Sequence, residues 1–534
     1  MTSITENARS TSGTALRLRD PCPLSGMCPI CVRECTVLCE IGKSAFRGRE
    51  VLYPSPQYFG DSTAASNKDY LLNWSDIQIQ TALLGAQGIE PDSDRALFTN
   101  VDVSSRVGGI ATRLPVMIAG LGSTDVARRN WASLAIGAAL SGAPTVVGEN
   151  VCGMDEKADF SADGKVLSSP EMKGRVETYR RFWDGEHGDI IVQTNVEDQR
   201  AGVDVYALNE LGVTTIERKW GQGAKAIGGE VRVDNLEKAV MLKRRGYLVL
   251  PDPDDAMTVE GFKEGAFRTF ERHSRVGMIA EEAFVEDVAW LRRQGAKRVF
   301  LKTGAYAPAA VAFTLRCASR AGIDLITFDG AGGGTGMSPV PMMNECSTPT
   351  LFLLAQVLEG VRMLRRNGKH VPDICIAGGF VNETQIFKAL AMSNFADGQG
   401  RLVRAVAMAR APITAAMKAA YFAELAETAS LPKVFGLSYG EEPDQFFITA
   451  PELRARFGDA VGSEIPWGAV GVYTYFSDRL KVGLQQLMAG CRKWKLDLLD
   501  RSDLAALSDR ASRVTGLPLI EDAQKEEFYK LLEF

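Results

Sequence analysis

The sequence has little histidine and no long apolar stretch. Its only histidines are His187, His273 and His370, and their spacing does not suit a shared metal ion. Apolar runs such as Leu351–Leu354 are far shorter than the ~20 residues that cross a bilayer. The polar opening, Met1 to Asp20, lacks the apolar core of a secretory signal. We therefore expect a cytoplasmic protein that is not inserted in a membrane.

An excess of charge of one sign is also lacking. The net charge is −5, from 61 basic and 66 acidic residues, and the sequence has no basic stripe and no long acidic run. This composition argues against nucleic acid as a partner. The 534 residues allow two or three domains, or one (β/α)8 barrel with flanking segments.

Short apolar runs alternate with helical patterns from about residue 115 onward. Each run ends in glycine or polar residues, as parallel strands joined by helices do. The eight runs are Val116–Leu121, Thr145–Gly148, Ile190–Gln193, Thr214–Lys219, Arg298–Lys302, Leu325–Phe328, Ile374–Ala377 and Val403–Met408. The helical patterns include Asp125–Leu140, Leu236–Arg245, Phe284–Arg293, Pro308–Ala321, Thr350–Arg366 and Glu383–Met392. Eight units favour an α/β fold closed as a (β/α)8 TIM barrel, and an open doubly wound sheet is the competing topology.

The remaining segments lack this alternation. A helix is predicted around Ile77–Leu84, and Tyr473–Leu498 has the pattern of a long amphipathic helix within a mainly helical C-terminal part. The predicted organisation is a cysteine-rich N-terminal segment over 1–60, a connecting segment over 61–114, the barrel over 115–420 and a helical C-terminal extension over 421–534.

Half of the ten cysteines lie near the N-terminus, at Cys22, Cys28, Cys31, Cys35 and Cys39. In a reducing cytosol, such a cluster indicates metal binding rather than disulfides. Structural zinc sites usually join two separated pairs of ligands, whereas ligands from one short loop are typical of iron–sulfur centres. We predict a 4Fe–4S cluster on Cys28, Cys31, Cys35 and Cys39, in which Cys22 could replace one ligand. Structural zinc or buried free thiols are the alternatives.

The last three predicted strands end in features that suit a flavin phosphate. Five glycines occupy the seven positions 330–336 after Asp329, and they let a flat ligand approach the backbone closely. The seventh strand is followed by Gly378-Gly379 and the eighth by Ala409-Arg410, where barrels commonly bind phosphate. A flexible loop is the alternative for residues 330–336.

Two lysines stand at predicted strand ends. Lys302 closes the fifth strand and Lys219 closes the fourth. A charge at the end of an inward-facing barrel strand is costly unless it meets an anion or an electron-rich ring. Barrel enzymes also draw their catalytic residues from these positions. For each lysine, a solvated side chain at a strand end is the alternative.

Two loops carry a resemblance to a known family. Residues 217–230, ERKWGQGAKAIGGE, resemble a signature of the FMN-binding synthase domain of glutamate synthase, and residues 329–339, DGAGGGTGMSP, resemble that family's glycine-rich loop with a small insertion. Residues 148–150 are similar to its Gly-Glu-Gly segment, and residues 473–504 to the helical tail after its barrel. The likeness spans roughly residues 110–504.

The resemblance implies an FMN-dependent oxidoreductase of amino-acid biosynthesis, in which flavin hydride reduces 2-iminoglutarate formed from 2-oxoglutarate and ammonia. It implies catalytic roles for Lys302 at the flavin, for Glu149 at the imine nitrogen and for Lys219 at a substrate carboxylate. The implied cofactor-binding residues are Gln193, Lys302, Asp329, Gly332, Gly333, Gly334, Gly378, Gly379, Ala409 and Arg410. The implied substrate-binding residues are Lys219, Gln222 and Lys225.

The sequence also departs from the family's pattern. Ala411–Lys418 contains no cysteine, so we expect the N-terminal cysteines to replace the cluster that follows the last strand in the family. The residues Cys346–Thr350 replace the family's acidic helix start, and this leaves the substrate open. The chain opens with Met1-Thr2-Ser3, without a cysteine for glutamine hydrolysis, and no nicotinamide domain is evident.

Electrons and ammonia are therefore expected to come from outside the chain. We expect ferredoxin or a reductase subunit as electron donor, solution or an amidotransferase subunit as the source of ammonia, and an oligomer. One alternative is a diverged FMN and iron–sulfur oxidoreductase that acts on another C=N or C=C substrate. A second alternative is an electron-transfer subunit of a larger complex.

The visible spectrum of the purified protein tests both expected cofactors. We predict the two absorption bands of an oxidised flavin, overlain by the broad brown shoulder of an iron–sulfur cluster. Because Cys31 is a predicted ligand, Cys31→Ser should weaken the shoulder and leave the flavin bands in place. A colourless protein would contradict both assignments, and flavin bands with bound zinc would contradict the cluster alone.

Overall fold

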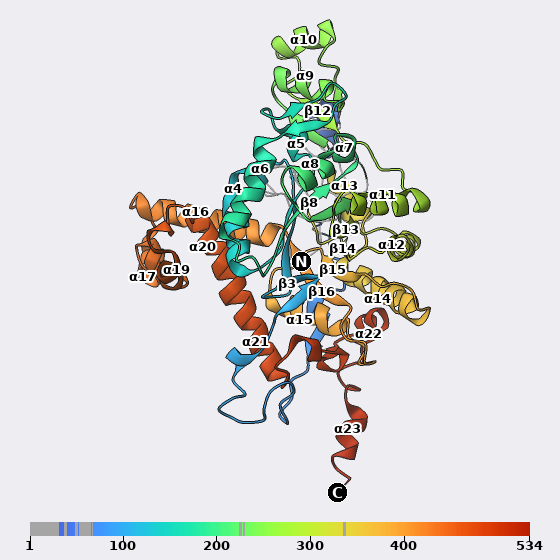
Figure 1. Ribbon diagram of the computed structural model, residues 1–534, viewed down its shortest axis with the longest axis vertical. Coiled ribbons are helices and arrows are strands. Elements are labelled where there is room, and N and C mark those ends of the chain that lie inside the picture. The colour runs from blue at the N-terminus through green and yellow to red at the C-terminus, as the bar shows by residue number, and fades with distance from the viewer. Residues whose placement is uncertain are drawn as a thin grey trace.

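The computed structural model describes residues 31–36, 40–48, 52, 66, 68–223, 227, 230–334 and 338–533. At its centre is a closed barrel of eight parallel strands surrounded by helices (Figure 1). The barrel strands are β4 (Val116–Leu121), β5 (Thr145–Val147), β8 (Ile190–Thr194), β9 (Thr215–Lys219), β13 (Arg298–Thr303), β14 (Leu325–Asp329), β15 (Asp373–Ala377) and β16 (Val403–Met408). Neighbours along the chain pair with one another, and β16 closes onto β4. The predicted TIM barrel is confirmed, and every predicted strand overlaps an observed one.

Burial on both faces explains why the strands have continuous apolar runs. All five residues are buried in β8 and in β14. Side chains such as Met117, Val146 and Phe300 fill the barrel interior, while alternate positions pack against the helices. Parallel strands covered on both sides need apolar residues at successive positions, so the local sequence is enough to mark them.

The helices around the barrel follow its strands. They are α4 (Asp125–Ser141), α5 (Val151–Met154), α6 (Pro170–Phe182), α7 (Val196–Arg200), α8 (Val203–Asn209), α11 (Glu281–Arg293), α12 (Pro308–Ala321), α13 (Val340–Glu345), α14 (Thr350–Arg366), α15 (Glu383–Met392) and α16 (Arg410–Glu427). Common capping residues mark where these helices begin and end. The α4 helix begins after the capping hydroxyl of Thr124 and ends at Gly142, which adopts a left-handed conformation.

Residues 230–273, which we call the excursion, leave the barrel between β9 and β13 and form a small unit at the top of Figure 1. Its strands are β10 (Glu230–Val233), β11 (Leu248–Leu250) and β12 (Phe270–His273), with β12 in the middle of an antiparallel sheet. Its helices are α9 (Leu236–Arg244) and α10 (Ala256–Lys263). The helix predicted at Leu236–Arg245 exists, but it packs on this sheet and not on the barrel, since periodicity does not specify what a helix packs against.

Segments from both ends of the chain close the bottom of the barrel. The hairpin of β2 (Ser105–Val107) and β3 (Ile110–Thr112) inserts Val107 and Ile110 against Phe300 and Leu325. The β1 strand (Ile77–Ile79) pairs with β17 (Leu504–Ala506), so the helix predicted around Ile77–Leu84 is wrong. In β1, Ile77 is buried and Gln78 exposed, and the partner that fixes this strand lies at the other end of the sequence.

The C-terminal part is mainly helical. Its longest helix runs from Trp467 to Gly490 and consists of α20 (Trp467–Tyr473), the π-helical η5 (Thr474–Leu480) and α21 (Lys481–Gly490). The helix predicted over Tyr473–Leu498 therefore starts earlier and ends sooner, because Arg492 turns the chain with a φ of +58°. The shorter helices are α17 (Lys433–Tyr439), α18 (Pro443–Phe446), α19 (Ala450–Phe457), α22 (Asp509–Thr515) and α23 (Lys525–Lys530).

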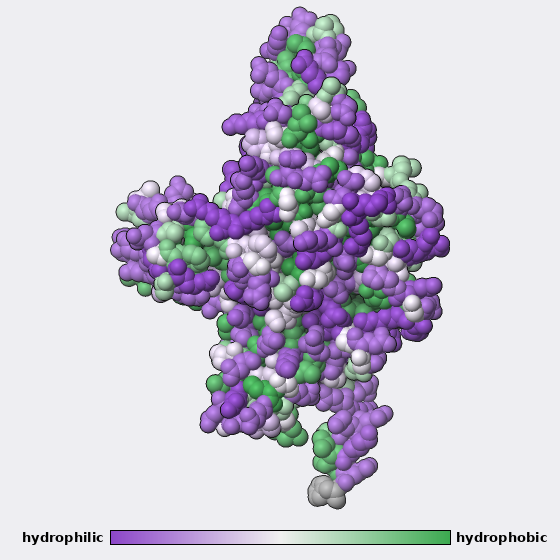
Figure 2. Space-filling model, viewed as in Figure 1, coloured by the Kyte–Doolittle hydropathy of each residue, from purple (hydrophilic) through white to green (hydrophobic). Residues whose placement is uncertain are grey.

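The short helices α17 to α19 form a lobe at the left of Figure 1. Figure 2 shows apolar side chains on this lobe, where Val434 and Leu437 of α17 are exposed. Within the described residues, no helix combines the length and apolar character needed to cross a bilayer.

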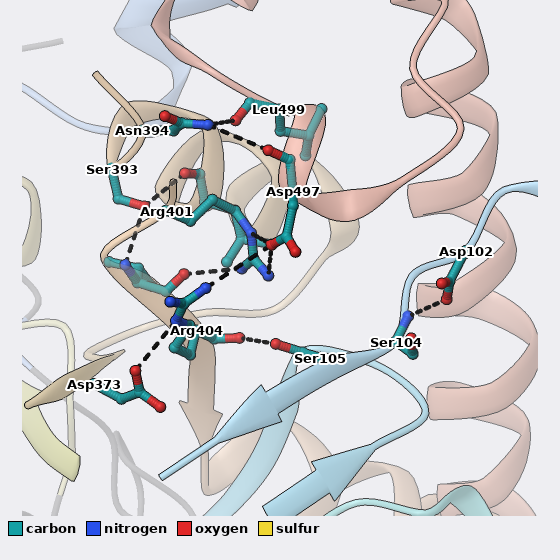
Figure 3. A network of polar contacts seen from close by, with 12 residues as sticks. Asp102, Ser104, Ser105, Asp373, Ser393, Asn394, Arg401, Arg404, Asp497 and Leu499 are labelled. Atoms are coloured by element: carbon teal, nitrogen blue, oxygen red, sulfur yellow. Dashed lines mark hydrogen bonds and ion pairs between the residues drawn. The ribbon is translucent and has the colours of Figure 1, made fainter. Parts of the chain in front are cut away.

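A polar network ties the C-terminal part to the bottom of the barrel (Figure 3). The buried Arg401 donates to Asp497 Oδ1 from Nε at 3.0 Å and to the carbonyl of Val403 at 2.9 Å. Arg404 donates to Asp373 Oδ1 at 3.2 Å, and Asn394 donates to the carbonyl of Leu499 at 2.8 Å. Burial lowers the pKa of Arg401 to about 10, and the carboxylate of Asp497 acts against this shift.

Removing the carboxylate of Asp497 should destabilise the fold. We expect Asp497→Ala to lower the free energy of unfolding by about 1–3 kcal/mol, because the buried Arg401 loses its charged hydrogen-bond partner. Chemical denaturation measures this change. The control is Asp522→Ala, which removes an exposed ion pair with Lys525 and should change the stability by less than about 0.5 kcal/mol. Equal effects of the two variants would contradict a stabilising role for the network.

Candidate active site

The carboxyl ends of the barrel strands open into one cavity of about 620 Å³. Almost all of the residues predicted to bind the flavin or the substrate line it. They are Glu149, Lys219, Gln222, Lys302, Asp329, Gly332, Gly333, Gly334, Gly378, Gly379, Ala409 and Arg410. Gln193 does not line the cavity, and Lys225 lies outside the described residues. The two glycine-rich loops after β14 and β15 therefore share one cavity.

Close packing between these two loops explains their glycines. A Cβ atom on Gly332 would lie 2.4 Å from the carbonyl oxygen of Gly378, and Gly378 has a φ of +119°, which only glycine adopts readily. The hydroxyl of Thr350 donates to that same carbonyl at 2.7 Å. The cavity wall is consequently backbone rather than side chain, and a flat ligand can lie against it.

Lys302 lies at the floor of the cavity and is 5% exposed. Its Nζ is 3.7 Å from Asp329 Oδ2. Burial acts to lower the pKa of Lys302, but the carboxylates of Asp329, Glu217 and Glu149 outweigh it and raise this pKa above its ordinary value. The lysine therefore keeps its positive charge in a place that is nearly closed to water.

Gln193 and Glu217 lie side by side beneath the cavity, on β8 and β9. The Gln193 amide donates to Glu217 Oε1 at 2.6 Å, and both residues are fully buried. Burial raises the pKa of Glu217, although Lys302 and Gln193 act against it. Gln193 Oε1 has no hydrogen-bond partner among the described residues. Gly120 separates Gln193 from the cavity, and a Cβ there would lie within 2.8 Å of the amide.

A second charged group lies on the side of the cavity formed by β5 and β9. Lys219 Nζ donates to Glu149 Oε1 and to Gln222 Oε1, both at 2.5 Å. All three side chains line the main cavity and also a smaller cavity of about 80 Å³ beside it. This arrangement brings a carboxylate, an ammonium and an amide to one point at the mouth of the barrel.

The backbone after Glu149 is held by a buried carboxyl. Asp198 accepts hydrogen bonds from the N–H of Asn150 at 3.0 Å and from the N–H of Asn195 at 3.2 Å. Asn150 has a φ of +63°, and its side chain accepts a hydrogen bond from the hydroxyl of Tyr247 at 3.2 Å. Burial raises the pKa of Asp198 to about 7. Asp198 and Tyr247 thus fix the turn that points Glu149 into the cavity.

The N-terminus of α16 lies at the opposite side of the cavity. No side chain caps its first turn, and Ala409, Arg410 and Ala411 line the cavity there. In contrast, α15 begins with a capping box in which Asn382 accepts from the N–H of Gln385. Uncapped N–H groups at a helix N-terminus favour an anion. The start of α16 therefore suits a phosphate better than the start of α15 does.

Several lining residues escaped the sequence analysis. Arg272, on β12 of the excursion, gave no local signal, because a strand of alternating residues does not indicate what its side chains face. The segment Gly120–Thr124 also lines the cavity, and its glycines at a strand end could have been noticed. Tyr475 reaches the cavity from the π-helical η5, a feature that is frequent at functional sites.

The structure describes two of the four predicted cluster ligands. Cys28 and Cys39 lie outside the described residues, while Cys31 is exposed and Cys35 half-buried. Within the described part of the chain, no group of three or more histidine, cysteine or acidic side chains could hold a metal ion. The 4Fe–4S cluster therefore stays a prediction.

The raised pKa of Asp198 predicts a pH dependence of stability. Between its ordinary value of 3.8 and about 7, the folded protein holds a proton on Asp198 that the unfolded chain has released. This carboxyl therefore lowers the free energy of unfolding as pH rises through that window, by on the order of 2–4 kcal/mol, and no further above it. We expect the stability of the natural protein, measured relative to Asp198→Asn, to fall from pH 4 to 7. A difference that stays constant across this window would contradict the shift.

Comparison with known proteins finds similarity over part of the chain. The conserved region in glutamate synthase matches residues 274–406, which include Lys302, Asp329 and both glycine-rich loops. The chain is 28% identical over 221 residues to the archaeal-type glutamate synthase [NADPH] of Thermotoga neapolitana, covering 41% of this chain and 38% of that protein. It is 30% identical over 196 residues to the archaeal glutamate synthase [NADPH] of Archaeoglobus fulgidus, covering 36% and 34%. The chain thus spans less than two fifths of the length of these relatives.

Solved structures offer only distant likenesses. A flavocytochrome b2 variant with pyruvate bound is 13% identical, with a TM-score of 0.47 over 90% of this chain and 88% of that one. A mutant of an active chimera of (S)-mandelate dehydrogenase is 16% identical, with a TM-score of 0.44 over 85% and 96%. The family match and the curated relatives are the informative comparisons: part of this chain, including residues 329–339, is similar to glutamate synthases.

Proposed function

We propose that this protein is an FMN-dependent oxidoreductase of glutamate synthase type, which reduces a 2-imino acid formed from 2-oxoglutarate and ammonia. The observation that carries the proposal is the charged, buried Lys302 at the floor of a cavity whose walls are glycine backbone. A permanent positive charge in such a place needs a function, because burial opposes it. Next to an electron-rich ring, the charge stabilises the electrons that the ring receives.

The residues that line the cavity suit both the ring and the phosphate of FMN. A volume of about 620 Å³ lies within the range of cofactor sites. The backbone of Gly332, Gly333, Gly378 and Gly379 offers a flat wall for the ring, and the uncapped start of α16 at Arg410 offers donors for the phosphate. The unpartnered Gln193 Oε1 beneath the floor suits a polar edge of a ligand above it. When bound, FMN supplies a hydride to the substrate.

Lys302 acts in this proposal by its charge. Its raised pKa keeps the ammonium protonated, so it offsets negative charge at the floor of the cavity. An ion pair with Asp329 holds the lysine in position. The hydrogen bond between Gln193 and Glu217 lies beside it and supports it from below. Gln193 does not line the cavity itself, so its proposed role is to support Glu217 through its amide and to offer its unpartnered Oε1 to the flavin from beneath.

Glu149, Lys219 and Gln222 receive the substrate. Lys219 and Gln222 hold a carboxylate, one as a point charge and the other as a hydrogen-bond donor, with Lys225 as a further candidate. Glu149 Oε1, which accepts from Lys219 Nζ, holds and releases the proton for the imine nitrogen. The turn fixed by Asp198 keeps this carboxylate directed into the cavity.

Electrons and ammonia reach this site from elsewhere in the proposal. Cys28, Cys31, Cys35 and Cys39 of the cysteine-rich segment over residues 1–60 would hold a 4Fe–4S cluster, which would supply a route for electrons from ferredoxin or a reductase subunit to the barrel over residues 115–420. Ammonia comes from solution or from an amidotransferase subunit. Support for these elements comes from the cysteine spacing and from the likeness to glutamate synthases.

Reoxidation of the reduced protein tests the proposed reaction. The anaerobically reduced protein is mixed with 2-oxoglutarate and ammonium, and the return of flavin absorbance is followed. We expect reoxidation that requires both compounds, with glutamate as the product. Glu149→Gln should keep the flavin and slow the reaction roughly 100-fold or more, since the proton of the imine nitrogen loses its carrier. The control Glu260→Gln, at an exposed position of α10, should react at the natural rate.

Two results would contradict this proposal. If 2-oxoglutarate and ammonium do not reoxidise the flavin, with or without a glutamine-hydrolysing partner, the substrate assignment fails and the diverged oxidoreductase is favoured. If the purified protein carries no flavin, the catalytic role itself fails. An unchanged rate in Glu149→Gln would remove Glu149 from the mechanism and leave the rest in place.

A further inference from the structure

The chain leaves the body of the protein after Ile520 in a projecting segment. Residues 521–533, which we call the tail, contain α23 and extend below the rest of the molecule in Figure 1. Just before the tail, the N–H of Ile520 still donates to the carbonyl of Ala506 in β17 at 3.0 Å. Almost every residue of the tail is exposed. From Gln524 onward, a single hydrogen bond within the described residues joins the tail to the body, from the Gln524 amide to the carbonyl of Ser502 at 3.4 Å.

The tail exposes large apolar side chains without a core of its own. Each of the four is more than half exposed, and they are Phe528, Tyr529, Leu531 and Leu532. Figure 2 shows their apolar surface at the lower end of the molecule. Isolated helices shorter than about 12–15 residues are marginal in water, and α23 has only six residues. A short helix with such an apolar surface is therefore expected to pack against another surface.

The helices α14 and α22 lie side by side next to the start of the tail. At one end, the guanidinium of Arg510 in α22 lies over the ring of Phe352 in α14, 5.6 Å from its centroid. At the other end, Arg501 donates to the carbonyl of the last residue of α22 and shares the ring of Phe395 with Arg362 of α14. The outer sides of the two helices therefore form one continuous surface.

This surface is basic and in part apolar. Glu359 and Asp509 are the only acidic residues of the two helices, and Met363 is an exposed apolar side chain. Six basic residues lie on the helices or just after α14, and we call them the basic face. Within the described part of the chain, no ion pair engages these six, which are Arg362, Arg365, Arg366, Lys369, Arg510 and Arg513.

The tail and the basic face are complementary in charge. The tail has five acidic and two basic residues, a net charge of −3. The basic face has six basic residues against the two acidic residues of its helices, a net charge of +4. Within one copy, the tail leaves the body after α22 and leads away from this face (Figure 1). A second copy can therefore receive the tail where the first copy does not.

We propose that the tail binds the basic face of a second copy, so that two copies exchange their tails reciprocally in a twofold dimer. Twofold dimers are the commonest symmetric assemblies, and in them each contact occurs twice. One buried aromatic side chain covers about 150–250 Å². The apolar side chains of two tails, with the surfaces that they cover, thus reach the ~1,200 Å² at which stable interfaces begin. The dimer is independent of the proposed reaction, because neither the tail nor the basic face lines the cavity.

Sedimentation velocity of the full protein over a range of concentrations tests this dimer. We expect the natural protein to sediment as a dimer that weakens as salt is added, because exposed charges are screened. Phe528→Asp combined with Leu531→Asp should raise the Kd of the dimer roughly 100-fold or more, since apolar contacts at the centre of an interface carry much of its affinity. Both positions are exposed, so the circular-dichroism spectrum should stay that of the natural protein.

A charge exchange tests the basic face separately. Arg366→Glu combined with Arg513→Glu should raise the Kd of the dimer about tenfold or more, because the face then repels the acidic tail. Adding Glu526→Lys and Glu527→Lys to that variant reverses the charge of the tail as well. We expect this fourfold variant to recover part of the lost affinity, which a variant that is merely misfolded does not do.

Two matched controls have their substitutions elsewhere on the surface. Leu437→Asp changes an exposed apolar residue of α17, and Arg129→Glu changes an exposed arginine of α4 that has no ion pair within the described residues. Both variants should dimerise like the natural protein. If Leu437→Asp dissociates the dimer and the tail variant does not, the lobe of α17 is the interface and the proposal is overturned.

Other results would also contradict the exchange of tails. A natural protein that is monomeric at all concentrations would show that the tail folds onto its own copy or serves a different partner. Dissociation by the tail variant, with a natural Kd in Arg366→Glu combined with Arg513→Glu, would overturn the basic face as the receiving surface.

Discussion

The centre of this protein depends on keeping the charge of Lys302 where water hardly reaches. Three carboxylates, from Asp329, Glu217 and Glu149, offset the burial of the ammonium, and each comes from a different barrel strand or the loop after it. Only a closed barrel brings those strand ends together, because parallel strands open on one side. The charge of Lys302 at the floor of the cavity therefore depends on the closure of the sheet, and the polar groups beneath the cavity help to hold that charge.

The two ends of the barrel are built for different purposes. At the bottom, the hairpin of β2 and β3 and the pair of β1 and β17 bury apolar side chains, and the Arg401 network joins distant segments. At the top, glycine loops, an uncapped helix start and partly satisfied polar groups face a cavity. The lower end has no part in the cavity and contributes mainly to stability. The upper end, with its buried charges, contributes less to stability.

Much of this arrangement could be predicted from the sequence, because the relevant signals are local. A strand buried on both faces shows itself as an apolar run, and the order of such runs in a barrel places Lys302, Asp329 and Gly378 at one mouth. The position of Arg272 could not be predicted, since it depends on the pairing of β12 with β10 and β11 and on how that sheet lies over the barrel. The pairing of β1 with β17 joins opposite ends of the chain in the same way. The register of β8 and β9 places Gln193 opposite Glu217, and its role at the flavin stays a prediction.

The excursion has an apolar cluster of its own, made by residues such as Leu242, Val249 and Phe270. Its Tyr247 and Arg245 hydrogen-bond to the segment after β5. The conserved region in glutamate synthase begins at residue 274, just beyond the excursion. A unit that carries its own core can change by mutation without disturbing the packing of the eight strands. Over evolutionary time, the side chains that this unit places at the mouth of the cavity can thus change independently of the strands below it.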